Sequence, residues 1–149
     1  MTALITSELV ILDAEVPDRA TVTRMLGERL AAAGRVTDVE GFLADVKARE
    51  EQMPTGLPGG IGIPHARSAF VTVPTLGFAR VPKGVDFGAE DGPANIVFLI
   101  AAPEGGGSEH LTILASLARK LIHQSFRDSL LAAADEQAVV DIISKEVGG

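Results

Sequence analysis

His65 is the side chain in this sequence whose type and setting most suggest chemistry. It lies in "GGIGIPHAR" (residues 59–67), after two glycines, a short apolar run and Pro64. An imidazole titrates near pH ~6.5, so at neutral pH it is often uncharged and nucleophilic. Glycines let a partner's backbone approach closely, and the proline ring stiffens the backbone before the histidine. The stretch is typical of an imidazole at a strand end that is open to a large electrophile such as a phosphoryl group. A loop histidine without a function fits the local sequence equally well.

Two further side chains could assist such a reaction. His110 follows "EGGGSE" in or near the first turn of a predicted helix, where unpaired backbone N–H groups attract anions. Arg49, with Glu50, interrupts an apolar helical stripe, and its planar guanidinium fits phosphate oxygens. Simpler interpretations are a surface histidine at a helix end and a pair of solvated charges. His123 is interpreted as a cation near the end of the same helix as His110, where a positive charge is mildly favourable.

Several other chemistries lack the residues that they need. The chain has no cysteine, which removes disulfides, thiolate zinc sites and cysteine nucleophiles. The P-loop, the dinucleotide-binding glycine pattern and the G-x-S-x-G elbow are all missing from the sequence, so ATP, NAD and serine-hydrolase sites have no support. A zinc site on His65 and His110 is a rival hypothesis, but it needs a third ligand. A net charge of −7, with no clustered Lys or Arg and no Trp or Tyr, argues against nucleic-acid binding.

Length and composition predict one globular domain over residues 1–149. The chain has 149 residues and is 46% apolar, enough for a single core. Its start, "MTALITSELV", lacks the pattern of a signal peptide. The longest apolar run, "IVFLIAA", is too short to span a bilayer. We therefore expect a cytoplasmic protein without direct membrane insertion.

The apolar patterns predict the elements that must position these side chains. Helices are predicted from Pro17 and Asp18 to Gly34, from a Thr37–Glu40 capping box to Pro54, after "EGGGSE", over 125–133 and over 135–146. The helix after "EGGGSE" has an apolar face of Leu111, Leu114, Ala118, Leu121 and Ile122. Strands are predicted at 61–63, at "TLGFARV" and at "NIVFLIAAP", the last covered on both faces because it is continuously apolar. Strands mixed with helices in this way indicate a three-layer α/β fold.

Taken together, three spans resemble a known family. "AREEQMPTGLPGGIGIPHAR", "GVDFGAEDGPANIVFLIAAPEG" and "EHLTILASLARKL" are similar to the fructose/mannitol-type EIIA domain of the bacterial phosphoenolpyruvate-dependent sugar phosphotransferase system. The similarity covers nearly the whole chain in the right order. Its most specific part is the Arg-Glu pair, then Thr-Gly, then the Ile-Pro-His step that ends at His65.

The resemblance implies a fold and a set of roles. The fold would be a three-layer sandwich with a central mixed β-sheet flanked by helices. His65, through Nε2, would accept a phosphoryl group from HPr or an HPr-like domain and pass it to EIIB, which phosphorylates a sugar entering through the membrane component EIIC. His110 would hydrogen-bond the phosphoryl group, Arg49 would neutralise its charge, and Thr55 would either donate a hydroxyl or shape the turn. No metal or cofactor is implied.

The branch of the family is less sharply indicated. "AAPEG", "EHL" and the "GVDF…DG" turn look most like fructose-specific members. The mannitol, galactitol and nitrogen-regulatory branches share much of this scaffold. The alternative hypothesis is therefore a nitrogen-related regulator that binds other proteins according to its phosphorylation state.

Overall fold

A mixed β-sheet forms the centre of the molecule in the computed structural model, which describes residues 3–105 and 109–147, with the side chains of 109–111 and 114 left out. Within these residues the sheet has six strands in the order β1-β5-β6-β3-β2, and β4 also pairs with β6. The strands are β1 (Val10–Ile11), β2 (Gly56–Leu57), β3 (Ile61–Gly62), β4 (His65–Ser68), β5 (Thr75–Val85) and β6 (Ala94–Pro103). β1 is parallel to β5, and β3 and β4 are parallel to β6, whereas β2–β3 and β5–β6 are antiparallel.

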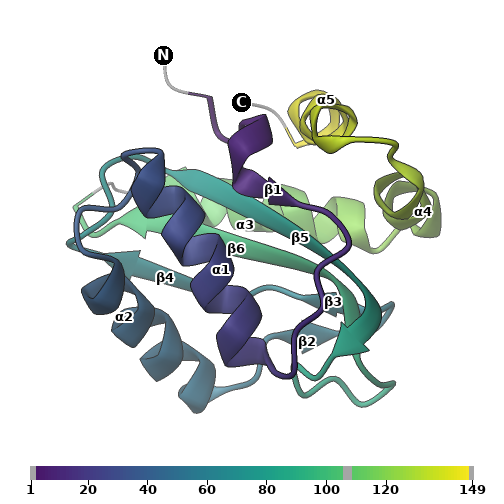
Figure 1. Ribbon diagram of the computed structural model, residues 1–149, viewed down its shortest axis with the longest axis horizontal. Helices are drawn as coiled ribbons and strands as arrows, with labels where there is room; N and C mark the ends of the chain where they lie inside the picture. The colour runs from purple at the N-terminus through teal and green to yellow at the C-terminus, as the bar shows by residue number, and fades with distance from the viewer. Residues whose placement is uncertain (1–2, 106–108, 148–149) are drawn as a thin grey trace.

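Helices cover both faces of this sheet. They are the 3₁₀ turn η1 (Ser7–Leu9) and the α-helices α1 (Arg19–Ala32), α2 (Val39–Gln52), α3 (Glu109–Leu121), α4 (Gln124–Ala132) and α5 (Glu136–Glu146). Figure 1 shows α1 and α2 on the near face of the sheet and α3 on the far face. The predicted three-layer sandwich with a mixed sheet is confirmed. None of the helices in the described part of the chain is long and apolar enough to cross a membrane.

The core is built on the two long central strands, β5 and β6. Every residue of β6 except Asn95 and Pro103 is buried, which confirms the prediction that this strand is covered on both faces. Phe78 and Phe98 are directly paired across the two strands. Their rings meet edge to face, with centroids 5.2 Å apart, an arrangement that aromatic pairs favour. These strands give the sheet a rigid centre against which the shorter strands carrying the candidate site are aligned.

The first helix follows its predicted boundaries. The Asp18 carboxylate accepts a hydrogen bond from the Thr21 N–H at 2.9 Å, so it caps the N-terminus of α1. Gly34 follows the helix with φ of +77°, a conformation in which glycine has no steric penalty. The sequence signals at both ends of α1 are therefore confirmed.

The predicted capping box of the second helix is wrong. Asp38, not Thr37, is the N-cap of α2, and its carboxylate accepts from the Gly41 N–H at 3.2 Å. The Thr37 N–H and hydroxyl both donate to the Phe70 carbonyl, so Thr37 is engaged outside the helix. Glu40 accepts two hydrogen bonds from Arg24 of α1, at 2.7 and 2.8 Å. That bidentate pair directs the glutamate toward α1 instead of back to the cap.

The end of α3 also differs from the prediction. α3 stops at Leu121, and Ile122 is 75% exposed, so Ile122 does not belong to the predicted apolar face. Leu117 and Leu121 are the fully buried members of α3 among its described side chains, while the predicted Leu111 and Leu114 lie outside them. His123 is the N-cap residue of α4, with no side-chain capping bond. It therefore begins a helix rather than sitting in the last turn of one.

Candidate active site

His65 begins a strand rather than ending one. It is the first residue of β4, and it is aligned with Ile100 of the parallel strand β6. β3 and β4 keep one register against β6, since Gly62 is aligned with Val97 and His65 with Ile100. Between them lies Pro64, which has no N–H to give to the ladder, although its carbonyl accepts from the Ile100 N–H at 3.0 Å. The proline step thus separates a hairpin strand from a strand that presents the histidine.

One ring nitrogen of His65 is held by the backbone. Nδ1 lies 2.8 Å from the Ile63 carbonyl oxygen, and the side chain is half-buried. A carbonyl oxygen only accepts hydrogen bonds, so this contact places the proton on Nδ1. In the neutral ring the lone pair is then on Nε2. Nε2 is the nitrogen left to act as a nucleophile.

The glycines before His65 have local structural roles. Gly59 and Gly60 form the turn between β2 and β3 with φ of +98° and +78°, which glycine adopts without strain. A Cβ on Gly62 would lie 2.6 Å from the Phe87 ring. The hairpin itself therefore requires these glycines. From the sequence, the same glycines were interpreted as room for a partner's backbone to approach.

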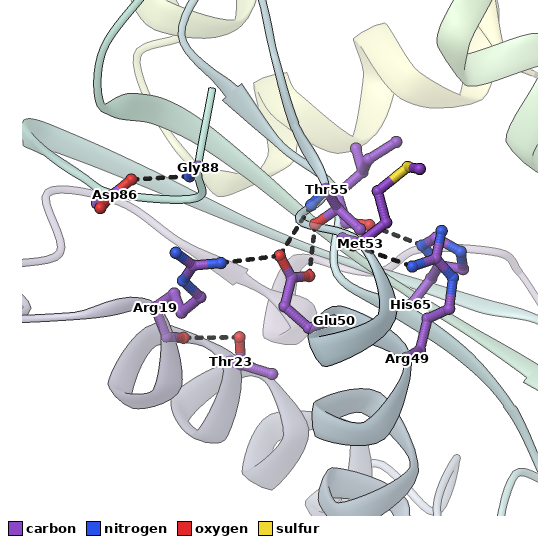
Figure 2. A network of polar contacts seen from close by, with 10 residues as sticks. Arg19, Thr23, Arg49, Glu50, Met53, Thr55, His65, Asp86 and Gly88 are labelled. Atoms are coloured by element: carbon purple, nitrogen blue, oxygen red, sulfur yellow. Dashed lines mark hydrogen bonds and ion pairs between the residues drawn. The ribbon is translucent and has the colours of Figure 1, made fainter. Parts of the chain in front are cut away.

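Arg49 lies in the last turn of α2, which packs against β4. Its Nη1 donates to the Met53 carbonyl at 3.1 Å. This is the guanidinium's one hydrogen bond within the described residues, so its remaining N–H groups are open to an anion. In Figure 2 the Arg49 and His65 side chains extend to the same side of the view, past the C-terminal end of α2. Met53, which follows α2 here, is 65% exposed.

Thr55 is joined to Glu50 by two hydrogen bonds. Its N–H donates to Oε2 at 2.8 Å and its hydroxyl to Oε1 at 2.6 Å, and Thr55 is 5% exposed. Figure 2 shows this Glu50 carboxylate between Thr55 and Arg19. Of the two roles considered for Thr55, this geometry favours shaping the turn, because the hydroxyl hydrogen is already donated within the protein. Glu50 was not among the predicted site residues. The sequence signal that could have found Glu50 is its charge, which together with that of Arg49 interrupts the apolar stripe of the helix.

His110 is the second residue of α3, as its place after the glycine loop predicted. Its side chain lies outside the described residues, so the structure does not place it relative to His65. Among the side chains that are described, no group of three or more histidines or carboxylates could hold a metal ion. Figure 2 shows His65, Arg49 and Thr55 in one region around the C-terminal end of α2.

These features define a chemical class. Within the described residues, the side-chain hydrogen bonds of His65 and Arg49 engage Nδ1 and one guanidinium nitrogen. A neutral imidazole whose Nε2 lone pair is available is a nucleophile, and a guanidinium with N–H groups available stabilises anionic charge. That combination suits a protein that carries phosphoryl groups on a histidine.

Comparison with known proteins agrees with this class. The family described as phosphoenolpyruvate-dependent sugar phosphotransferase system, EIIA 2, matches residues 3–146. The fructose-specific EIIA component of Haloferax volcanii is 39% identical over 141 residues, which are 94% of this chain and 92% of that protein. The fructose-specific EIIABC component of Bacillus subtilis is 37% identical over 97% of this chain, which spans 23% of that longer protein.

Solved structures show the same fold. The nitrogen regulatory protein IIA-Ntr of Neisseria meningitidis has a TM-score of 0.81 and 31% identity, covering 94% of this chain and 96% of that one. The mannitol enzyme IIA of Escherichia coli, solved in complex with phosphorylated enzyme IIB, has a TM-score of 0.80 and 26% identity, covering 95% of this chain and 99% of that one. The chain belongs to the EIIA type 2 family of the sugar phosphotransferase system. It is a phosphotransferase that carries phosphoryl groups on a histidine.

Proposed function

We propose that His65 is the histidine that carries the phosphoryl group. The observation that supports this most directly is the contact between His65 Nδ1 and the Ile63 carbonyl at 2.8 Å. The Nε2 lone pair forms a bond to phosphorus while the phosphorus–nitrogen bond of the donor phosphohistidine breaks, and its electron pair returns to the donor ring. Transfer to the acceptor repeats the same exchange. The proton stays on Nδ1, where the carbonyl stabilises the charge that the phosphorylated ring gains.

Arg49 neutralises the phosphoryl oxygens during this transfer. Phosphoryl transfer depends mainly on positioning and on stabilising charge spread over the oxygens. The guanidinium donates to the Met53 carbonyl through Nη1. This bond fixes one edge of the fork and leaves the other N–H groups without a hydrogen bond to the described residues. His110 in the first turn of α3 donates a further hydrogen bond to the phosphoryl group, and Thr55 holds the turn.

The donor in this proposal is HPr or an HPr-like domain, and the acceptor is EIIB, coupled to the membrane component EIIC. The related mannitol enzyme IIA of Escherichia coli was solved with phosphorylated IIB. The Bacillus subtilis relative is named as a fructose-specific EIIABC component. The names of the Bacillus subtilis relative and of the Haloferax volcanii relative, both fructose-specific, support fructose as the transported sugar. We further propose that residues 1–149 form a single EIIA domain that works in the cytoplasm, without a cofactor.

Phosphoryl labelling tests the assignment of His65. The full chain is incubated with phosphoenolpyruvate, enzyme I and HPr, and acid-labile phosphate is measured on the protein. Wild type and His123→Ala should label, because the His123 side chain makes no capping hydrogen bond, whereas His65→Ala should not. Equal labelling of His65→Ala would show that another residue is the nucleophile.

A second candidate is a regulator whose protein binding depends on phosphorylation. The similarity to the Neisseria nitrogen regulatory protein, at 31% identity, supports it. Onward transfer discriminates between the two functions, because a regulator would take phosphate from HPr without delivering it to a sugar-specific EIIB. The higher identity to a fructose-specific component, 39%, favours the transport function.

A further inference from the structure

Arg19, the first residue of α1, reaches across to the end of α2. Its Nη1 donates to Glu50 Oε2 at 3.1 Å, although the two residues are 31 positions apart in the sequence. The Arg19 side chain is 34% exposed and that of Glu50 is 11% exposed. The guanidinium carbon also lies 5.8 Å from the centre of the Phe87 ring, within the range of a cation–π contact. Within the described residues the Arg19 guanidinium therefore has two partners, Glu50 and Phe87, and both lie beside the hairpin that precedes His65.

The first partner begins a series of hydrogen bonds that ends at the imidazole. Glu50 accepts from the Thr55 N–H and hydroxyl, at 2.8 and 2.6 Å. The Thr55 carbonyl accepts from the Ile63 N–H at 3.2 Å. The Ile63 carbonyl in turn accepts from His65 Nδ1 at 2.8 Å. Figure 2 shows Glu50 between Arg19 on one side and Thr55 on the other.

The second partner holds both strands of the same hairpin. The Phe87 carbonyl accepts from the Gly56 N–H of β2 at 3.0 Å. Its ring packs against Gly62 of β3, where an added Cβ would lie 2.6 Å away. A displacement of Phe87 would move both strands, and with them the Ile63 carbonyl that orients His65.

We propose that Arg19 is a positioning residue for phosphoryl transfer, acting through Glu50 and Phe87 on the orientation of the His65 ring. The proposal rests on the proposed role of His65. Arg19 does not touch the phosphoryl group. It holds the largely buried Glu50 carboxylate in place between Arg19 and Thr55. Hydrogen bonds to an ionised carboxylate are stronger than those between neutral groups, so Glu50 fixes the position of Thr55 tightly. A shift of the nucleophile of even about 1 Å can cost roughly 100-fold in rate.

A neighbouring ion pair provides a matched control. Arg24, also on α1, pairs with Glu40 of α2 at 2.7 Å, with side chains 46% and 70% exposed. Both pairs join α1 to α2 through an arginine and a glutamate. Within the described residues, no hydrogen bond continues from Glu40 into the hairpin. If loss of packing between α1 and α2 lowered the transfer rate, substitution of either arginine would lower it. If loss of positioning is the cause, only substitution of Arg19 would lower it.

The first test is the rate of phosphoryl transfer from HPr to the full chain. Arg19→Gln should lower kcat roughly 10- to 100-fold, with the KM for HPr unchanged within about twofold because Arg19 does not contact the reacting groups. Arg19→Lys, which keeps the charge but offers a single donor centre, should recover part of the rate. Arg24→Gln should match wild type.

The second test reads the ring directly and does not need phosphoryl transfer. Nitrogen NMR of the neutral His65 ring should show the Nδ1–H tautomer in wild type and in Arg24→Gln. Arg19→Gln should populate the Nε2–H tautomer and should also lose hydrogen-exchange protection at the Thr55 amide. If wild type takes up no phosphate on His65, the proposed function fails, while this NMR test of Arg19 keeps its meaning.

Two results would overturn the proposal. One is an Arg19→Gln variant with wild-type kcat and tautomer, and the other is an equal loss in Arg24→Gln. Should Arg19→Gln fail to fold, the milder Arg19→Lys and Glu50→Gln variants and their combination take its place. If the effects of Arg19→Lys and Glu50→Gln on kcat are non-additive in the double variant, the proposal is supported. Additive effects would contradict it.

Discussion

The His65 ring donates from Nδ1 to the carbonyl oxygen of Ile63, two residues earlier, at 2.8 Å. Pro64, which lies between the two residues, restricts the local backbone and so helps to bring the Ile63 carbonyl within reach of the ring. The contact favours the Nδ1–H tautomer of the histidine. This also fixes which ring nitrogen can react.

The first prediction is that the phosphoryl group resides on Nε2. The Nδ1 proton is held by the Ile63 carbonyl, so only Nε2 has a lone pair for phosphorus in the neutral ring. Nitrogen and phosphorus NMR of the phosphorylated chain distinguish the two isomers by their shifts and couplings. A phosphoryl group found on Nδ1 would mean that the contact with Ile63 is broken during the reaction.

The second prediction concerns Arg49→Lys. The Arg49 fork donates to the Met53 carbonyl, and in the proposed role its other edge binds the phosphoryl group. A lysine ammonium is a point charge and does not reproduce such a planar fork. We expect transfer from HPr to slow by roughly 100-fold, at the lower end of the range for the loss of one charge-stabilising donor. Arg29→Lys is the control, because Arg29 also donates to a backbone carbonyl, that of Glu8, but on α1. If the two variants lose rate equally, Arg49 has no specific role at the site.

The third prediction is that Gly56→Ala destabilises the fold. A Cβ on Gly56 would lie 2.6 Å from the Ala89 nitrogen and 2.7 Å from the Phe87 oxygen, and backbone atoms have little freedom to move away. Overpacking of this kind typically costs about 1–3 kcal/mol. Gly105→Ala is the control, since no described atom lies within 4 Å of its added Cβ. Denaturant unfolding of both variants measures the difference, and equal stability would show that the β2 strand relaxes freely.

The fourth prediction concerns acid stability and Asp18. The Thr21 hydroxyl and then the Thr21 N–H donate to this carboxylate, and these bonds lower its pKa below the ordinary 3.8. A carboxyl whose pKa is lower in the folded state adds stability that is fully present above pH 3.8 and is lost as the pH falls through the folded value. Asp18→Asn keeps a capping oxygen but does not titrate. The free energy of unfolding should therefore fall less steeply toward low pH in this variant, and identical slopes would contradict the assignment.

The sequence predicted the parts of the fold that depend on near neighbours. The long apolar run of β6, the Asp18 cap and Gly34 each act within a few residues, so their patterns are visible in the chain. Thr37 shows where this reasoning fails. Its capping role was lost to a contact with Phe70, which is brought near only by the tertiary fold.

The candidate site divides in the same way. His65 and Arg49 were predicted from residue type and family resemblance, since both stand in recognisable short motifs, and their roles stay predictions. Arg19 was not, because its contacts with Glu50 and Phe87 join three separate segments. An arginine at the start of a helix gives no sign in the sequence of which distant carboxylate it will reach.

The fifth prediction tests His110 against His123. His110 lies in the first turn of α3, where backbone N–H groups favour an anion. We expect His110→Ala still to take phosphate from HPr, because His65 is the proposed nucleophile, but to pass it to EIIB roughly 100-fold more slowly for lack of one donor to the transferring group. His123→Ala should transfer normally, because His123 precedes α4 as its N-cap residue and its side chain makes no capping hydrogen bond. Single-turnover transfer from the purified phosphoprotein to EIIB measures this step alone. Normal onward transfer by His110→Ala would remove this residue from the mechanism and leave Arg49 to stabilise the charge.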